Sequence, residues 1–388
     1  MAHHRPARLR HIAGIGVDRM GAIADNSSID FLRLENLDTD IPPDAVAIER
    51  SRKALDEDAA NSYLPFVGQD RLRDVVAKHV GQITGKAYTR DNVVISAGGL
   101  SGILNTLLAT IDVGDEVILT DPTYAGLLNR VRLAGGSPVT APLRFEAGRY
   151  WRLDVRAIEE KITPRTRAML LMSPSMPTGV VFTETEWRRI ADLCIRHDLL
   201  LIVDSAMERL LFHGQDVFHP AQIDGMARRT ISVGAASKEL RMIGWRVGWI
   251  VAPQQYMPDL IAVSLANVVV PVGVAQDAAA TALESSWTTL PAYVQELQRR
   301  CDAVAEALDG LPYGLPAGGW SLLLRVSDFQ LDGELMSKRL LQHGVCATAM
   351  QGWGEVHGSQ YIRFVFANEP VERLRLLGTR VRAALEGP

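Results

Sequence analysis

Cysteine is scarce in this chain of 388 residues, and long apolar runs are missing. The three cysteines, Cys194, Cys301 and Cys346, lie far apart and form no Cys-x-x-Cys pair. This usage argues against a disulfide framework or a cysteine-based metal site and favours a reducing, cytoplasmic setting. No apolar run reaches the roughly 20 residues of a membrane span, and no apolar segment of a secretory signal follows the basic N-terminus. We therefore expect neither a membrane anchor nor export.

An excess of charge of one sign is missing as well. The formal net charge is −4, and acidic and basic residues are interspersed along the chain. This balance excludes a basic stripe for nucleic acid or an anionic membrane, so we expect a small-molecule partner. Hydrophobic residues make up 47% and charged residues 22%, which is typical of globular proteins. The length exceeds what one core usually holds, which predicts two packed domains.

The middle of the chain alternates between short apolar runs and amphipathic stretches. Helical spacing of apolar residues occurs between these runs, for example over Ser101–Ile111 and Thr183–His197. This alternation predicts an α/β fold with a parallel sheet covered on both faces. The runs that we interpret as buried strands are Val93–Ser96, Glu116–Thr120, Ala168–Met172, Leu199–Val203 and Thr230–Val233.

The pattern changes after about Ser285. A long helix is predicted over Leu290–Leu308, followed by strands within Gly318–Val326 and Tyr361–Phe366. This order indicates a smaller α+β domain, to which the segment Phe31–Pro43 contributes. We therefore predict an N-terminal arm and part of the small domain over 1–45, a large domain over 46–285 and a small domain over 286–388.

A glycine turn after the first predicted strand leaves two interpretations open. The glycines Gly98, Gly99 and Gly102 would let backbone N–H groups and a helix N-terminus hold a phosphate. Asp121 follows at about the 20-residue spacing of a ribose-binding carboxylate, so an NAD-dependent dehydrogenase is one candidate. Against it, Ala97 stands where the first glycine of that motif belongs, and Asp121 runs directly into a turn that presents Tyr124.

Three charged residues at strand ends point to a different cofactor. Asp204 ends the apolar run Leu199–Val203, at the edge where open α/β sheets bind ligands. A carboxylate there needs a cation, and a protonated pyridine nitrogen would be one. Lys238 follows another apolar strand, where dry surroundings lower the pKa of an amine and allow imine formation. Arg246, between glycines and tryptophans, suits a bidentate phosphate contact.

The order of these motifs resembles the class I/II aminotransferases of the pyridoxal 5′-phosphate (PLP) dependent fold type I, and the resemblance extends from Tyr63 to Arg363. It implies a large domain with a mostly parallel seven-stranded sheet and a smaller α+β domain. The motifs that carry it are the Gly98-Gly99 turn, Asp-Pro-Thr-Tyr at 121–124, Pro-Thr-Gly at 177–179, Asp204, Ser237-Lys238 and Gly-Trp-Arg-Val-Gly at 244–248.

The resemblance implies a role for each matching residue. Lys238 would be the Schiff-base lysine and the acid/base, Asp204 would pair with the pyridine nitrogen, and Tyr124 would stack on the ring. Arg363 would bind the substrate carboxylate. An isolated arginine within an apolar strand needs an anionic partner, and this supports the same role independently of the resemblance. The remaining implied residues are Gly99, Leu100, Ser237 and Arg246 at the phosphate, Tyr63 reaching the phosphate of a neighbouring subunit in a homodimer, and Asn36 and Trp320 near the substrate.

Two positions depart from the family pattern. Met176 replaces the usual asparagine before Pro-Thr-Gly, and Met207 replaces the usual tyrosine after Asp204. Both usual residues donate hydrogen bonds to the phenolic oxygen of the cofactor, O3′, and a thioether cannot donate one. We therefore expect Met176 and Met207 to line the wall of the cofactor site. We also expect the imine between the cofactor and Lys238 to have a higher pKa than is usual in the family.

The predicted function is exchange of an amino group between an L-amino acid and a 2-oxo acid. The altered surroundings of O3′ leave a second interpretation open, a PLP-dependent lyase, cyclase or oxidase that acts on a specialised amino acid. No metal is expected in the site. Turnover without any oxo acid would favour the second interpretation.

Overall fold

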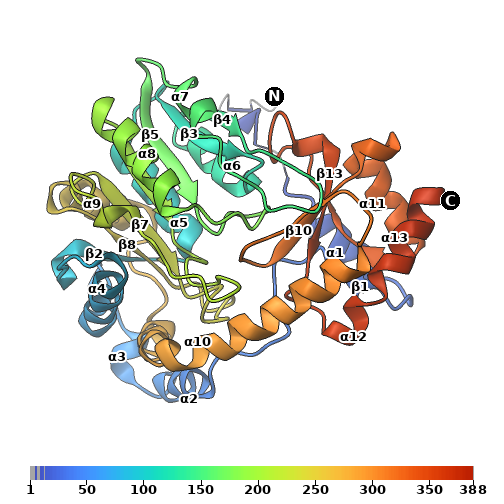
Figure 1. Ribbon diagram of the computed structural model, residues 1–388. Helices are drawn as coiled ribbons and strands as arrows, with labels where there is room; N and C mark the ends of the chain where they lie inside the picture. Colours follow the sequence, from blue (N-terminus) through green and yellow to red (C-terminus); the bar gives the residue numbers. More distant parts are fainter. Residues whose placement is uncertain (1–4, 7–8, 13, 388) are drawn as a thin grey trace.

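A seven-stranded sheet forms the centre of the larger part of the molecule (Figure 1). The computed structural model describes residues 5–6, 9–12 and 14–387. The strands lie in the order β2-β8-β7-β6-β5-β3-β4, and all are parallel except β8, which is antiparallel to both of its neighbours. Their bounds are β2 Val93–Ser96, β3 Glu116–Asp121, β4 Ser137–Pro142, β5 Thr166–Met172, β6 Leu200–Asp204, β7 Thr230–Ala235 and β8 Gly248–Val251. This arrangement confirms the predicted α/β fold with a mostly parallel seven-stranded sheet.

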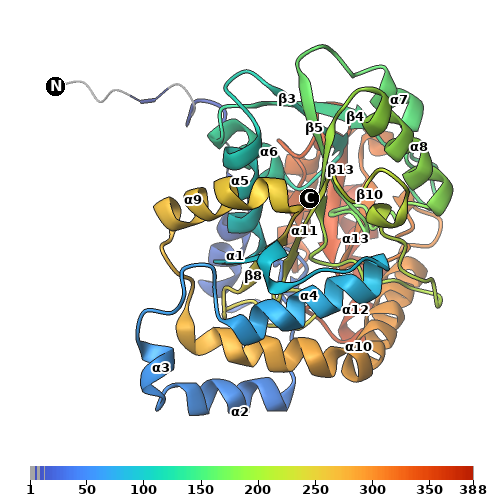
Figure 2. The same cartoon turned by 90° about the vertical axis from the view of Figure 1, so that its left-hand side faces the viewer.

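Both faces of this sheet are buried, which explains why its strands are continuous apolar runs. Successive side chains of a strand point to opposite faces. On β6, Leu201 and Val203 therefore pack into one cluster while Leu200 and Ile202 pack into another. Helices α5 (Gly99–Thr110), α6 (Ala125–Leu133) and α9 (Met257–Asn267) cover one face, and α4 (Asp70–Thr84), α7 (Val155–Glu159) and α8 (Glu184–Arg196) lie on the other (Figure 2).

Local capping signals set the helix bounds. Helix α8 begins with a capping box in which the Thr183 and Glu186 side chains accept hydrogen bonds from each other's backbone N–H groups. The remaining helices that flank the large sheet or precede it are α1 Val17–Asp25, α2 Ala45–Ala54 and α3 Asp58–Asn61. None of the helices in the described residues is long and apolar enough to cross a membrane.

The smaller part is built on a four-stranded antiparallel sheet in the order β12-β13-β10-β9. A separate pair, β1 and β11, brings the N-terminal segment into this part, because Leu32 lies opposite Val345. The elements are β1 Leu32–Arg33, β9 Tyr313–Gly314, β10 Ser321–Arg325, α11 Gly333–Gln342, β11 Val345–Cys346, β12 Thr348–Ala349, β13 Tyr361–Val365, α12 Val371–Leu374 and α13 Leu377–Glu386.

One long helix, α10 (Gly273–Ala307), connects the two parts (Figure 1). It begins well before the predicted start at Leu290 and contains Pro291 in its interior. Its first half packs on α2 and α4, and its second half packs on α12 and α13. The predicted domain boundary at residues 285 and 286 thus falls inside a continuous helix, and the division into domains stays a prediction.

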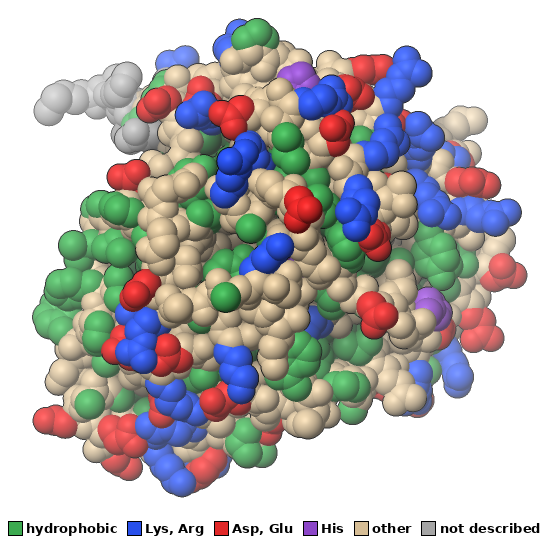
Figure 3. All heavy atoms as spheres, turned by 60° about the vertical axis from the view of Figure 1, so that its left-hand side comes forward, with side chains coloured by type: hydrophobic (Ala, Val, Ile, Leu, Met, Phe, Trp, Pro, Cys, Tyr) green, Lys and Arg blue, Asp and Glu red, His purple; other side chains and the backbone are tan. Residues whose placement is uncertain are grey.

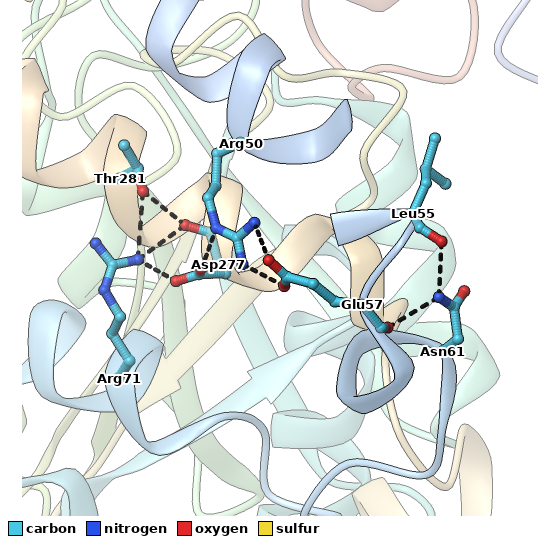
Figure 4. Close-up of polar contacts among 7 residues, drawn as sticks. All are labelled: Arg50, Leu55, Glu57, Asn61, Arg71, Asp277 and Thr281. Atoms are coloured by element: carbon cyan, nitrogen blue, oxygen red, sulfur yellow. Dashed lines mark hydrogen bonds and ion pairs between the residues drawn. The ribbon is translucent and has the colours of Figure 1, made fainter. Parts of the chain in front are cut away.

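A network of ion pairs fastens α10 to the elements before the large sheet (Figure 4). Arg50 of α2 and Arg71 of α4 both bind the carboxylate of Asp277 on α10. Arg50 also pairs with Glu57, with an N–O distance of 2.5 Å. Burial raises the pKa of Asp277, but the hydrogen bonds from the two arginines outweigh it and lower the pKa overall. Elsewhere on the surface, basic and acidic side chains are interspersed, as Figure 3 shows for one face.

Candidate active site

A cavity of about 180 Å³ lies at the carboxyl edge of the parallel strands. The strand ends and the turns that follow them supply most of its wall, as expected for an open α/β sheet. The predicted residues that line it are Gly99, Leu100, Tyr124, Met176, Asp204, Met207, Ser237, Lys238 and Arg246. The prediction did not include Leu37, Met172, Ala206, Ala235 and Ile243, which complete the lining.

The amine of Lys238 lies in a confined position just beyond β7. Its Nζ donates a hydrogen bond to the Leu37 carbonyl oxygen at 2.9 Å and lies 4.1 Å from the centre of the Trp320 ring. Burial lowers the pKa of Lys238 to about 7, and the positive charges of Arg363 and Arg246 act in the same direction. A large fraction of this amine is therefore unprotonated at neutral pH and can act as a nucleophile or a base.

The carboxylate of Asp204 lies at the end of β6, on the strand next to β7. Its side chain accepts one hydrogen bond, from the Ala206 N–H at 3.1 Å. Burial raises the pKa of Asp204 to about 6, and the nearby cations Lys238 and Arg130 offset only part of that effect. The site thus holds a buried carboxylate that a cationic ligand group would stabilise.

The opposite end of the cavity is suited to an anion. Gly98 precedes α5 with a φ of +85°, and no side chain caps the helix, so its first N–H groups face the cavity end. A Cβ on Gly98 would lie 2.5 Å from Arg246 Nη2, so a side chain there would displace this guanidinium, and the positive φ itself favours glycine. Arg246 Nη1 donates to the Ser237 hydroxyl at 3.5 Å. Helix terminus, hydroxyl and guanidinium are donors of the kind that bind an anion.

Methionine side chains form an apolar part of the wall. Met176 and Met207 are buried, and Met172 of β5 lies with them along the cavity. The Ser321 hydroxyl lies 3.3 Å from the Met176 sulfur, but its single proton has a closer acceptor in the Pro177 carbonyl oxygen at 2.8 Å. Neither thioether can donate a hydrogen bond to a ligand.

Arg363 occupies the centre of β13 and is completely buried. Its Nη2 donates to the Glu35 carbonyl oxygen at 2.7 Å and to the Thr348 hydroxyl at 3.1 Å. Its Nε and Nη1 have no partner among residues 5–6, 9–12 and 14–387. Burial lowers the pKa of Arg363 to about 10, and the nearby Tyr124 and Glu35 offset only part of that effect. A dry guanidinium with two unused donors is suited to receive a ligand carboxylate.

Trp353 packs against both Arg363 and Tyr124, and Tyr124 belongs to the cavity wall. The Trp353 ring stands 4.7 Å from the guanidinium carbon of Arg363 and 5.3 Å from the Tyr124 ring, at an interplanar angle of 66° to the latter. Gly126 leaves the space for Tyr124, since a Cβ there would lie 2.3 Å from the Tyr124 ring.

Four of the predicted residues do not line the cavity, and the buried Arg363 is one of them. Trp320 is buried directly behind Lys238, Asn36 is half-buried on the N-terminal segment beside Leu37, and Tyr63 is 84% exposed. Within one chain Tyr63 is a surface residue, so its predicted role at a neighbouring subunit stays a prediction.

The carboxylate of Asp121 does not face a ligand site. It is completely buried and accepts hydrogen bonds from the backbone N–H groups of Glu355, Val356 and His357. A ribose would have to displace all of these contacts. The dehydrogenase interpretation, which depended on Asp121, is therefore wrong.

An α/β sheet with a reactive lysine, an opposed carboxylate and an anion site defines a class of enzymes that form an imine with an aldehyde cofactor. The family description "Aminotransferase class I and II" matches residues 32–381. This chain belongs to that family.

Known proteins of several specificities are similar to this chain. It is 31% identical to aromatic-amino-acid aminotransferase 2 of Thermococcus litoralis, over 82% of each chain. It is 34% identical to the arginine–pyruvate transaminase of Pseudomonas aeruginosa, over 80% of this chain and 79% of that protein. The structure superposes on N-succinyldiaminopimelate aminotransferase of Mycobacterium tuberculosis with a TM-score of 0.90 at 27% identity, covering 98% of this chain and all of the other.

These findings confirm the predicted family and the predicted transferase activity, exchange of an amino group between an amino acid and a 2-oxo acid. The lyase, cyclase and oxidase interpretation rested only on the methionine substitutions, and no relative named here carries such an activity in its name.

Proposed function

We propose that the chain is an aminotransferase that uses PLP bound covalently to Lys238. The observation that carries the proposal is the pairing, across one small cavity, of an amine whose pKa is about 7 with a buried carboxylate. Class I and II aminotransferases of this fold depend on PLP, and the dimensions and polarity of the cavity suit it. The Asp204 carboxylate would hold the proton on the ring nitrogen, and the anion site at α5 would take the phosphate.

When bound, the cofactor supplies an electron sink that makes the α-carbon of the substrate acidic. The protein's own groups perform the rest. Arg363 would bind the substrate carboxylate and so orient the Cα–H bond, and Tyr124 would hold the ring plane. Lys238 Nζ would take the proton from the α-carbon and deliver it to the cofactor carbon C4′, so that the amino group stays with the cofactor, and the reverse transfer would serve the oxo acid. The buried rings of Trp320 and Trp353 exclude water from the side of the cavity that faces β13.

Two copies of the chain would complete the site. The proposal is supported by exposed apolar side chains around residues 63–66 and 269–272, where Tyr63 is 84%, Phe66 49% and Val272 47% exposed. The segment is held against the start of α10, since a Cβ on Gly273 would lie 2.2 Å from the Ala60 carbonyl oxygen. Such a grouping of apolar side chains is typical of an association surface, and we expect a homodimer in light scattering. The three cysteines are free and buried, which favours a reducing cytoplasmic compartment.

The test is reductive trapping followed by a half-reaction screen. Borohydride reduction of the PLP-loaded protein should place the pyridoxyl label on Lys238, and Lys238→Ala should carry none. The screen mixes the yellow enzyme with aromatic amino acids, arginine and aspartate and follows conversion of the cofactor band. A label at another residue, or ammonia release without formation of the aminated cofactor, would contradict the proposal.

A further inference from the structure

The carboxylate of Asp121 joins the two parts of the molecule. It ends β3 of the large sheet, while the three N–H groups that it accepts belong to the loop between β12 and β13. The distances are 2.7 Å from Glu355 N, 2.8 Å from Val356 N and 3.1 Å from His357 N. Three charge-assisted bonds to consecutive amides hold a loop far more firmly than apolar contact alone.

The fit between Asp121 and the loop leaves no free space. A Cβ on Gly354 would lie 2.1 Å from Asp121 Oδ1, so the loop backbone approaches as closely as glycine allows. On the other side of Gly354, the Trp353 carbonyl oxygen accepts a hydrogen bond from Thr123 N at 2.8 Å. Trp353 is therefore fixed to the turn after β3 from both directions.

The residue fixed in this way contacts two parts of the active site. One face of Trp353 lies against the guanidinium of Arg363, and its ring meets the edge of Tyr124. The hydrogen bonds of Arg363 Nη2 to Glu35 O and Thr348 Oγ1 fix one end of the guanidinium, and the Trp353 ring packs against the guanidinium and supports its plane. Its unpartnered nitrogens can meet a carboxylate only if that plane is held.

We propose that Asp121 is a positioning residue, which holds Trp353 so that Arg363 presents its free donors to the substrate carboxylate. The proposal rests on the carboxylate-binding role of Arg363 proposed above. Asp121 forms no ion pair within the described part of the chain. The proposal explains why this position holds a carboxylate and not a neutral hydrogen-bond acceptor.

The test is a double-mutant cycle on ligand binding by the PLP-loaded dimer. Pyruvate, 2-oxoglutarate and phenylpyruvate are first compared as substrates of the aminated enzyme, and the one that reacts fastest is used as the ligand. Its Kd is then measured by calorimetry with the enzyme whose cofactor is linked to Lys238, because that form binds an oxo acid without reacting. Asp121→Asn turns an NH₂ group toward one of the three amides, and Gly354→Ala disturbs the same contact from the loop. Each should raise Kd about tenfold, a typical coupling between neighbours in one network. In the Arg363→Gln background the same changes should alter Kd less than about twofold.

Several controls separate positioning from stability and from the proposed function. Asp332→Ala removes another Asp side chain that accepts a backbone N–H, from Leu335 at 2.7 Å at the start of α11, and should leave Kd unchanged. The pyridoxyl label on Lys238 and the visible band should persist in all variants. An unchanged Kd in both Asp121→Asn and Gly354→Ala, or an equal effect with and without Arg363, would overturn the proposal. Loss of the label in the unmutated protein would instead overturn the proposed function.

Discussion

Replacing Arg363 with methionine should weaken ligand binding and at the same time stabilise the ligand-free enzyme. Burial lowers the pKa of this guanidinium from 12.5 to about 10. At 1.36 kcal/mol for each pKa unit, the charge costs about 3 kcal/mol in the free protein. Because the folded pKa lies below the unfolded one, this cost is present in full at every pH below about 10.

The methionine variant removes that cost together with the two hydrogen bonds of Nη2. Those two bonds contribute about 1 kcal/mol each. The Glu35 carbonyl oxygen is not left without a donor, because the Thr348 hydroxyl donates to it at 3.4 Å. The net gain is therefore about 1 kcal/mol, which corresponds to a rise in Tm of about 1 °C for a chain of this length.

Binding should move in the opposite direction. A carboxylate that loses its charged hydrogen bonds loses at least about 3 kcal/mol, or more than a hundredfold in Kd. The assay pairs calorimetric titration of a 2-oxo acid with scanning fluorimetry of the ligand-free, PLP-loaded protein. Arg363→Lys is the matched control, which keeps the charge and loses the planar fork. A variant that melts at a lower temperature and still binds normally would refute the reasoning.

Further predictions concern the lysine, the methionine wall and the ion-pair network. The rate at which cofactor-free enzyme captures PLP should rise with pH around a midpoint of about 7, set by the pKa of Lys238, and a midpoint near 10 would contradict the burial argument. Met176→Asn should supply a donor to the cofactor's phenolic oxygen and lower by about 1 unit the pH at which the visible band changes, whereas Met176→Leu should not; equal midpoints in both variants would exclude this account. Asp277→Asn should cost about 1–2 kcal/mol at pH 7 in denaturant titration. Because the pKa of Asp277 is lowered on folding, that stability is present above the unfolded value of 3.8 and disappears as pH falls through the folded pKa, so the two proteins should become similar in strong acid.

The large sheet was predictable because its strands are buried on both faces. Continuous apolar runs such as Val93–Ser96 leave little choice of structure, and the structure reproduces those bounds. Strand β4 escaped prediction because it is an edge strand with a mixed burial pattern and two prolines. The early start of α10 was not predicted because proline is typical of the first turn of a helix, so Pro291 suggested a start close to it. In the structure the helix continues on both sides of Pro291, because its packing against other elements stabilises it.

The meeting of Asp204 and Lys238 at one cavity was predictable for a related reason. Asp204 and Lys238 each follow an apolar strand, so the sheet itself brings them to one edge. The contacts between Asp121 and the loop at Gly354 link residues more than 200 positions apart through backbone amides. Backbone N–H and carbonyl groups occur at nearly every residue, so residue types do not reveal which of them will form a given contact. Neither the Asp121 contact nor the role of the Leu37 carbonyl could therefore be predicted from the sequence.

The continuity of α10 limits how the molecule can change shape. The small sheet is attached to the large one through a rigid rod 35 residues long, so the two cannot drift apart independently. Pro291 lacks the N–H that would bond the Trp287 carbonyl, so the helix has one backbone hydrogen bond fewer at that turn. A rotation of the small sheet relative to the large one would therefore bend α10 at this turn, and it would at the same time strain the three hydrogen bonds that Asp121 accepts.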